Sequence, residues 1–377
     1  MNGNPGVDET VLIESFRHAR LQVVRLSGGS LRRYFVTDAS GGDGGTEGLV
    51  RDIADFLRYS GASVAAMNLF GPCAMRDGVL DLFRRRCGAE WPYTWIDGSA
   101  FAGHAPLTAQ FYAVEGPIES LWFDGRRVGS IIEDDDARYV IVVGLHPADL
   151  RAPRAVQARS LFERFDAALR GAGMDFYNIV RTWLYCDRIL EWYDELNCVR
   201  NRFFSERGVY DRLVPASTGV GTANPTGAAI VGEALAMQPK RPSIVAQSLP
   251  SPLQCPAPVY GSAFSRAVEV RMPAYRCLYV AGTASIHPDG RTAHVGDVEA
   301  QVDLTMRVVW GILESAGYDW SDINRATAYF KRPGDTGAWN RWVTRNGVGD
   351  LPVVVVRADI CRDDLLFEIE VDALRPD

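Results

Sequence analysis

The chain repeats itself at fixed spacing. Gln157 and Gln301 each precede a glycine by 16 positions. An arginine follows each of these glycines by 8 positions, at Arg181 and Arg325. Gap-free spacing of this kind indicates an internal repeat, in which each copy is one structural unit that buries its apolar face against its neighbours. The chain is therefore constrained to fold as tandem copies of one unit.

Three such repeats account for nearly the whole chain. We expect a degenerate first repeat, a middle repeat, a proline-containing linker and a last repeat, with the bounds 1–115, 116–237, 238–260 and 261–377. The first repeat needs gaps to align with the others. Its closing segment places Gln110 near the position that Glu368 occupies in the last repeat.

Each repeat has the predicted order β-β-α-β-α-β-β. In the last repeat, alternating and then continuous apolar residues predict strands at 267–272 and 277–286. The segment 297–315 carries the apolar stripe of a helix, which Gly317 ends. Two helices cover one face of such a sheet, so the other face must be buried as well. We expect an α+β fold of three mixed sheets packed as a pseudo-trimeric barrel, with helices outside and clefts where repeats meet.

Composition narrows the range of partners. The hydrophobic content of 47% and the charged content of 23% are ordinary for a globular protein. The net charge of −7 argues against nucleic-acid binding, and an anionic substrate would need a local cluster of arginine or lysine. No apolar run approaches the roughly 20 residues of a membrane span, Met1–Thr10 shows no secretory signal, and the seven cysteines lack CxxC spacing. We expect a cytoplasmic monomer or homo-oligomer that acts on a small molecule.

The closing strands of the last two repeats differ at one important position. Val231 stands in the middle repeat where the last repeat has Glu368, whereas Glu233 matches Glu370. One functional site among equivalent scaffold positions would explain this difference. Glu368 and Glu370 share one face of the predicted strand about 7 Å apart, close enough for each to raise the pKa of the other. The alternative is a solvent-facing strand with ordinary surface acids.

Four short motifs of the last repeat are similar to a known family. The motifs are Gly282-Thr283, Ala316-Gly317, Pro352 and Glu368-Ile369-Glu370. They resemble the Rid/YjgF-like (chorismate mutase-like) family of small trimeric proteins. Members that hydrolyse enamines and imines carry an arginine two positions after the late proline, where this chain has Val354. This departure argues against an imine hydrolase.

Longer segments carry a more specific resemblance. The segments are 181–183, 192–193, 201–204, 215–219, 282–286, 301–306 and 328–331. From about residue 50 to the C-terminus they resemble the chorismatases. The resemblance implies cleavage of pyruvate from chorismate without a cofactor, with release of either a dihydroxycyclohexadiene carboxylate or a hydroxybenzoate.

The implied reaction assigns roles to particular side chains. Cleaving the enol ether needs a proton at the methylene carbon, and Glu368 with a raised pKa is the candidate acid. The resemblance implies a cysteine at the position of Cys361 in enzymes that form 3-hydroxybenzoate, although a lone cysteine is often a small buried hydrophobe. Two carboxylates on the substrate call for cations. The substrate-binding candidates are Arg341 and its twin Arg202, Lys331, Tyr329 and Glu370.

Neither a cofactor nor a metal is expected. His287 and His294 flank a turn, and exposure at a hairpin tip explains them as well as a metal does. The segment 219–227 lacks the Gly-Lys-Ser/Thr ending of a phosphate loop. The leading hypothesis is therefore a chorismatase of the 3-hydroxybenzoate-forming type. The alternatives are hydrolysis of chorismate to the diol and a Rid-like ligand-binding protein without turnover.

Overall fold

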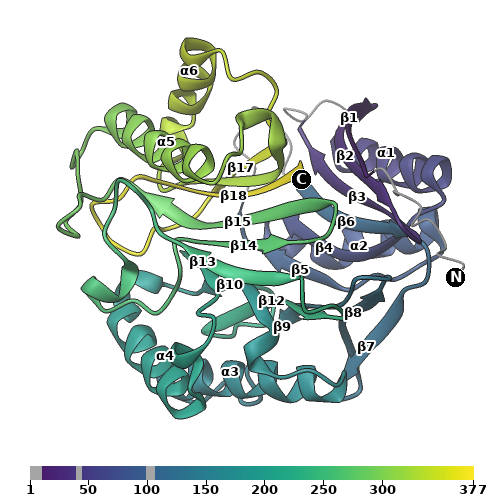
Figure 1. Cartoon of the computed structure of the whole chain (residues 1–377), viewed down its shortest axis with the longest axis horizontal. Coiled ribbons are helices and arrows are strands. Elements are labelled where there is room, and N and C mark those ends of the chain that lie inside the picture. The colour runs from purple at the N-terminus through teal and green to yellow at the C-terminus, as the bar shows by residue number, and fades with distance from the viewer. Residues whose placement is uncertain (1–10, 40–44, 99–106) are drawn as a thin grey trace, which may run out of the picture.

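Three six-stranded sheets form the interior of the molecule, and the helices lie outside them (Figure 1). The computed structural model describes residues 11–39, 45–98 and 107–377. The sheets follow one another along the chain and remain separate, joined by isolated bridges such as that between Gly221 and Asp359. This arrangement confirms the expected fold of tandem Rid-like units, although the three sheets do not merge into one closed barrel within the described ranges.

The first repeat contains the sheet β1-β2-β3-β6-β4-β5. Its strands are β1 (Leu12–His18), β2 (Leu21–Gly28), β3 (Leu31–Asp38), β4 (Ser63–Phe70), β5 (Tyr93–Ile96) and β6 (Thr108–Glu115). Its helices are α1 (Gly45–Ser60) and α2 (Arg76–Cys87). Helix α1 lies at the periphery of the molecule (Figure 1). The degenerate repeat that the sequence predicted at the start of the chain is thus a complete sheet with two helices.

The middle repeat contains the sheet β7-β8-β9-β12-β10-β11. Its strands are β7 (Glu119–Phe123), β8 (Arg126–Glu133), β9 (Ala137–Leu145), β10 (Ile179–Cys186), β11 (Ala216–Gly221) and β12 (Ile230–Pro239). Its helices are α3 (Arg154–Gly171) and α4 (Tyr193–Arg207). Leu161, Phe162, Phe165 and Leu169 give α3 an apolar stripe, because residues three and four apart share one face of a helix.

The last repeat contains the sheet β13-β14-β15-β18-β16-β17. Its strands are β13 (Val245–Leu249), β14 (Ala267–Arg271), β15 (Tyr275–Ala284), β16 (Ile323–Phe330), β17 (Val353–Arg357) and β18 (Phe367–Pro376). Its helices are α5 (Val298–Ser315) and α6 (Gly337–Asn346). The segment 238–260, expected as a linker, therefore contains the edge strand β13. This strand was not predicted because it is only five residues long and none of its residues is buried, so it lacks the apolar alternation of a core strand.

Strand register shows which residues are equivalent in the three repeats. Each closing strand has a register shift at the same place against its antiparallel neighbour, in the pairs β4–β6, β10–β12 and β16–β18. Counted from that shift, Gln110 corresponds to Glu233 and Glu370. The counterpart of Glu368 in the first repeat is Thr108. The gapped sequence alignment had placed Gln110 two residues away from its true counterpart.

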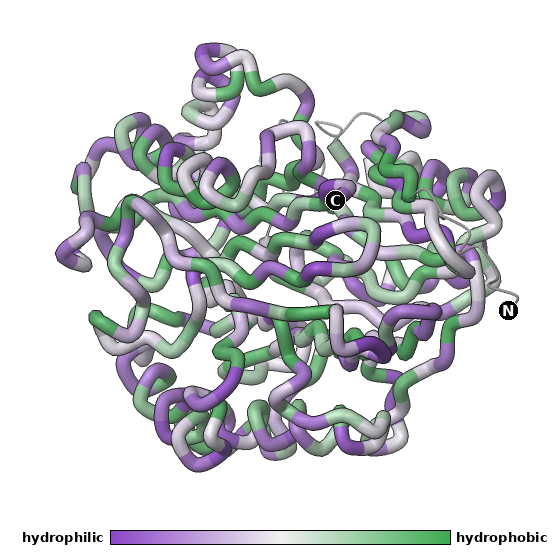
Figure 2. The backbone as a smooth tube through the Cα atoms, viewed as in Figure 1, coloured by the Kyte–Doolittle hydropathy of each residue, from purple (hydrophilic) through white to green (hydrophobic). Residues whose placement is uncertain are grey.

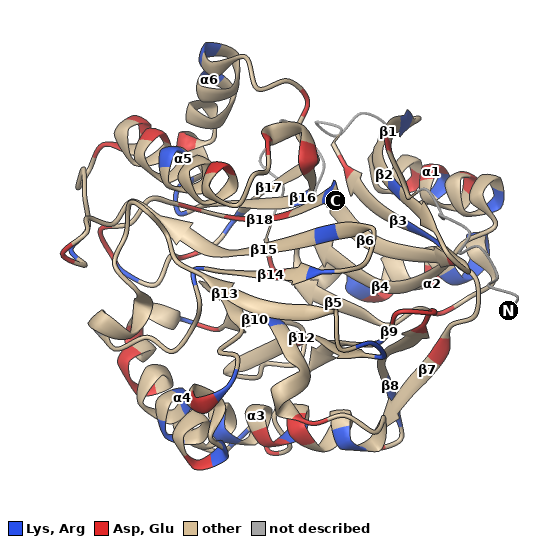
Figure 3. Ribbon diagram, in the orientation of Figure 1, with Lys and Arg blue, Asp and Glu red and all other residues tan. Residues whose placement is uncertain are grey.

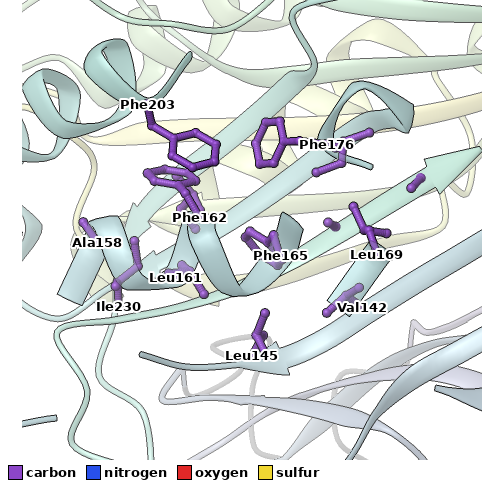
Figure 4. Packing of buried hydrophobic residues seen from close by; sticks show 14 of the residues in the cluster. Val142, Leu145, Ala158, Leu161, Phe162, Phe165, Leu169, Phe176, Phe203 and Ile230 are labelled. Carbon is purple, nitrogen blue, oxygen red and sulfur yellow. The ribbon is translucent and has the colours of Figure 1, made fainter. Parts of the chain in front are cut away.

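Aromatic packing fixes the helices of the middle repeat against their sheet (Figure 4). Phe162 of α3 stacks on Phe203 of α4, with ring centroids 5.5 Å apart. Phe176 meets Phe203 edge-on at 5.0 Å. The apolar residues concentrate in the interior (Figure 2). No helix among the described residues is long and apolar enough to cross a membrane.

Candidate active site

Glu368 lies where the middle and last repeats meet. Its side chain is 3% exposed, and in the sheet it stands between Ala284 of β15 and Tyr329 of β16. A Cβ atom added to Gly282 would lie 2.1 Å from Glu368 Oε1 and 3.2 Å from Cγ2 of Thr218 on β11. The carboxyl group therefore occupies space that only a glycine at position 282 leaves open, beside a strand of the middle repeat.

The surroundings of Glu368 favour its neutral form. Burial raises the pKa of its carboxyl group to about 8, and the charge of Glu370 adds to the rise. Arg181 and Arg266 act in the opposite direction but do not cancel the effect. Glu368 is therefore mainly a protonated acid near neutral pH, as a general acid must be.

Glu370 has the opposite protonation behaviour although it lies two residues away. It is fully buried between Arg181 and Arg325, with N–O distances of 2.9 Å to each guanidinium group. Burial alone would raise the pKa of Glu370, but Arg325 and Arg181 hold it below its ordinary value. The rise in pKa that the sequence predicted for both glutamates therefore applies to Glu368 alone, because two arginines stabilise the charge on Glu370. Figure 3 shows the acidic residues along β18 in the interior.

Cys361 belongs to the loop that leads into β18. Its thiol is half-buried, lies within electrostatic reach of Glu368 and is hydrogen-bonded to Tyr193. The Tyr193 hydroxyl is also 3.3 Å from Ser262 Oγ. Burial raises the pKa of the Cys361 thiol to about 12, and Glu368 adds to the rise. Cys361 is therefore a neutral thiol beside the acid rather than a thiolate nucleophile.

Tyr329 also lies beside the two glutamates. Its side chain is fully buried, and its hydroxyl finds no hydrogen-bond partner among the residues that the structure describes. Burial raises the pKa of Tyr329 well above its ordinary value, and Glu370 and Glu368 add to the rise. The structure thus brings together four of the residues selected from the sequence: Glu368, Glu370, Cys361 and Tyr329.

The three predicted cations lie elsewhere. Arg341 on α6 is 63% exposed, and its Nε is 2.6 Å from Glu299 Oε1 on α5. Arg202 is exposed on α4. Lys331 Nζ bonds to the side chain and backbone of Asp363, at 2.7 and 2.6 Å. The helices α4 and α6 cover the outer faces of their sheets, and Arg202 and Arg341 stand on the solvent-facing sides of these helices (Figure 1).

Two buried arginines that we did not select supply positive charge at this site. Arg181 is fully buried on β10, and Arg266 is 4% exposed just before β14. Arg266 donates two hydrogen bonds to the Cys255 carbonyl oxygen, at 2.9 and 3.1 Å. One signal pointed to Arg181, which interrupts the apolar strand 179–186, because a buried arginine requires a charged or polar partner. The sequence offered no comparable signal for Arg266.

Two further motifs from the sequence are the histidine pair and the glycine-rich segment 219–227. Across residues 11–39, 45–98 and 107–377, no cluster of three or more His, Cys, Asp or Glu side chains could hold a metal ion. The rings of His287 and His294 are 6.4 Å apart. In the segment 219–227, the amide of Gly221 donates to the Asp359 carbonyl oxygen at 2.7 Å, so this part of the segment joins the middle and last repeats.

Comparison with known proteins gives the fold and the family. A solved chorismatase structure superposes with a TM-score of 0.63 at 18% identity, covering 92% of this chain and 98% of that one. The curated chorismatase of Streptomyces hygroscopicus is 26% identical over 213 residues, which is 51% of this chain and 60% of that protein. This alignment covers less than two thirds of that relative's length.

The last repeat carries the family match. Residues 256–375 match the family model described as Endoribonuclease L-PSP. A RutC family protein of Pyrococcus horikoshii is 30% identical over 100 residues, which is 26% of this chain and 79% of that protein. The chain therefore belongs to the RutC family. Within that Rid-like fold it is a homologue of chorismatase.

Proposed function

We propose that this protein is an enzyme that cleaves pyruvate from chorismate, with Glu368 as the general acid. The observation that carries the proposal is the buried carboxyl group of Glu368, whose pKa is raised to about 8. The equivalent positions hold Val231 and Thr108 in the other two repeats, so neither repeat has an acid there. The similarity to the Streptomyces chorismatase supplies the substrate class.

The geometry suits a protonation of the enol ether. In the proposed step, Glu368 gives its proton to the methylene carbon, and the C=C electron pair forms the new C–H bond. The ether carbon becomes an oxocarbenium ion, while Glu368 becomes a carboxylate that the nearby charges of Arg181 and Arg266 favour. Pyruvate then leaves, either after water adds to the oxocarbenium carbon or when the ring hydroxyl displaces it from the ring carbon.

The substrate carboxylates need cations near this acid. Arg266 is the better candidate than Arg341, because its charge acts on Glu368 whereas Arg341 pairs with Glu299 on the outer surface. Arg181 is bonded to Glu370 and Thr218, at 2.9 and 2.7 Å, and is therefore assigned to holding the site together. Tyr329, with its partner-free buried hydroxyl among the described residues, is the proposed neutral donor.

We assign Cys361 to the choice of product. Formation of 3-hydroxybenzoate from chorismate requires loss of pyruvate followed by removal of a ring proton. The diol instead requires one added water. A neutral thiol beside Glu368 limits the space for that water and can relay a proton, which favours the aromatic product. We therefore propose 3-hydroxybenzoate as the main product, with the diol as the minor one.

The test is incubation of the purified protein with chorismate. Lactate dehydrogenase and NADH report released pyruvate, and chromatography separates 3-hydroxybenzoate from the diol. We expect pyruvate to appear in equal amount to the chorismate consumed. Bound chorismate without pyruvate release would instead identify a ligand-binding protein of the same fold, and the proposed activity would be rejected.

A further inference from the structure

A cavity lies between the first and middle repeats. Its volume is about 700 Å³, and it is lined by residues of β5, β9 and β12 together with α2 and the β7–β8 hairpin. A cavity of this size falls in the range of about 300–1,000 Å³ that is typical of small-molecule sites. It is separate from Glu368, which lies where the middle and last repeats meet.

This cavity occupies the position equivalent to the candidate active site. Val231 lines the cavity and is the counterpart of Glu368. Asn224 also lines it and stands 7 positions before Val231, as Cys361 stands 7 positions before Glu368. The same strand arrangement therefore builds the cavity and the candidate active site. The cavity has Val231 and Asn224 in place of the acid and the thiol.

Positive charge gathers at the rim of this cavity. Arg126 is exposed, and its Nη1 lies 2.6 Å from Nε2 of His146. The half-buried Arg127 donates to the Glu90 carbonyl oxygen at 3.0 Å, and its Nε has no hydrogen-bond partner. Within the described ranges neither arginine has a carboxylate partner within 4.0 Å. Glu90, the acid among the residues that line the cavity, is paired with Arg84 at 2.5 Å.

The histidine in this cluster is held neutral. Burial lowers the pKa of His146, and the charges of Arg126 and Arg164 lower it further, against a hydrogen bond to the Pro147 carbonyl oxygen. His146 therefore accepts a hydrogen bond from Arg126 instead of adding a third charge. The other arginines that line the cavity have carboxylate partners: Arg76 is paired with Asp77, Arg84 with Glu90 and Arg164 with Asp124. Arg126 and Arg127 are therefore the lining cations available to an anion.

Aromatic side chains line the same cavity. Tyr93, Trp91 and Trp95 come from the first repeat, and Trp122 and Phe123 come from the middle repeat. Trp122 is 64% exposed, which is unusual for a side chain of this size. Planar rings beside guanidinium groups favour a ligand that combines a flat ring with a negative charge.

We propose that this cavity binds a small aromatic carboxylate of the benzoate type without converting it. The site does not depend on the proposed activity at Glu368, because it is built from different residues in other repeats. Arg126 and Arg127 bind the carboxylate, and the tryptophans contact the ring. Val231, in place of the acid, leaves the bound molecule chemically unchanged.

Isothermal titration with benzoate tests this proposal, with inorganic phosphate as the comparison anion. We expect Arg126→Gln and Arg127→Gln each to weaken benzoate binding about tenfold or more, which is the usual effect of losing a charge-assisted hydrogen bond. Arg341→Gln, which removes an exposed arginine of the last repeat, should leave the affinity unchanged. Trp122→Ala alters only an exposed side chain and should also weaken benzoate binding.

Three outcomes would overturn the proposal. One is an affinity for benzoate that neither arginine substitution changes. Another is an equal loss in Arg341→Gln, which would show unspecific attraction to positive charge. The third is tighter binding of phosphate than of benzoate, because the site would then select charge and not the ring. None of these results depends on whether the protein releases pyruvate from chorismate.

Discussion

The two boundaries of the middle repeat are built from equivalent strands but differ in chemistry. Where the middle repeat meets the last one, Glu368 places a carboxyl group against Gly282, and its pKa is raised to about 8. Where it meets the first repeat, Val231 fills the same position and a cavity of about 700 Å³ lies beside it. A repeated scaffold thus places a buried acid at one boundary and a cavity at the equivalent boundary.

The position two residues further along each closing strand, held by Gln110, Glu233 and Glu370, also differs in charge among the three repeats. Gln110 is neutral and donates to the Ala326 carbonyl oxygen at 2.7 Å. Glu233 accepts from Asn68 at 2.6 Å, and burial raises its pKa to about 7. Glu370 is held charged by two arginines. At these positions, the last repeat therefore combines an acid with a raised pKa, Glu368, and an acid with a lowered pKa, Glu370.

The largest effect that we expect is on stability, from Glu370→Gln. This change leaves Arg181 and Arg325 buried beside a neutral amide, and loss of one partner from a buried ion pair costs about 3–5 kcal/mol. Denaturant unfolding measures the difference in free energy of unfolding. Glu233→Gln is the matched control and should cost much less, because an asparagine is the hydrogen-bond donor there. Equal losses for the two variants would contradict the distinction between the positions.

The pH dependence of turnover sharpens the same comparison. Glu368 donates a proton, so activity requires its protonated form, which is lost as the pH rises through about 8. We expect kcat/KM for chorismate to be level below that pH and to fall about tenfold per pH unit above it. The Glu233→Gln variant should show the same decline, because the decline reflects Glu368 and not Glu233, whose pKa is raised to about 7. A rate that rises between pH 7 and 9 would exclude Glu368 as the acid.

A smaller effect concerns the products. Cys361→Ala removes the thiol beside Glu368, so the variant should still consume chorismate but shift its products toward the diol. Chromatography gives the ratio, and Cys198→Ala, at an exposed position on α4, is the control. An unchanged ratio would reduce Cys361 to a packing residue. Diol as the only wild-type product would reject the product assignment but leave pyruvate release in place.

The smallest effect is expected for Arg341→Gln. Arg341 pairs with Glu299 on the surface, and such pairs contribute about 0–1 kcal/mol. We expect kcat/KM for chorismate to change less than about twofold. Steady-state assays of pyruvate release measure kcat and KM for both variants, and we expect Arg266→Gln to raise KM. A large loss of kcat/KM in Arg341→Gln would show that this arginine contributes to substrate binding or turnover.

Strong patterns in the sequence were sufficient for much of the fold. The strand predicted at 267–272 is β14 and the helix predicted at 297–315 is α5, each within one residue. Both have the full apolar period of their class, which local sequence carries by itself. The edge strand β13 was missed because it has no such pattern. The repeat also led directly to Glu368, since its equivalent in the middle repeat is Val231.

The sequence pointed to only one of the two buried arginines near Glu368, Arg181, and not to Arg266. Repeat spacing identified Arg341 and Arg202 as twins, but it does not say which face of a helix meets a sheet. Both arginines lie on the solvent-facing sides of their helices and are exposed. Arg266 precedes β14, and its effect on Glu368 depends on the pairing of β14 with β15 and of β15 with β18, which no local pattern encodes. The charged state of Glu370 likewise depends on Arg181, which is distant in sequence.

The most direct test of the central claim is Glu368→Gln. This substitution keeps the size of the side chain and removes the proton that the proposed reaction needs. Pyruvate release from chorismate should fall at least about a hundredfold, the usual scale for loss of a general acid, while thermal unfolding stays close to that of the wild type. Near-normal pyruvate release by a folded Glu368→Gln protein would contradict the account and transfer the role to Glu370 or another group.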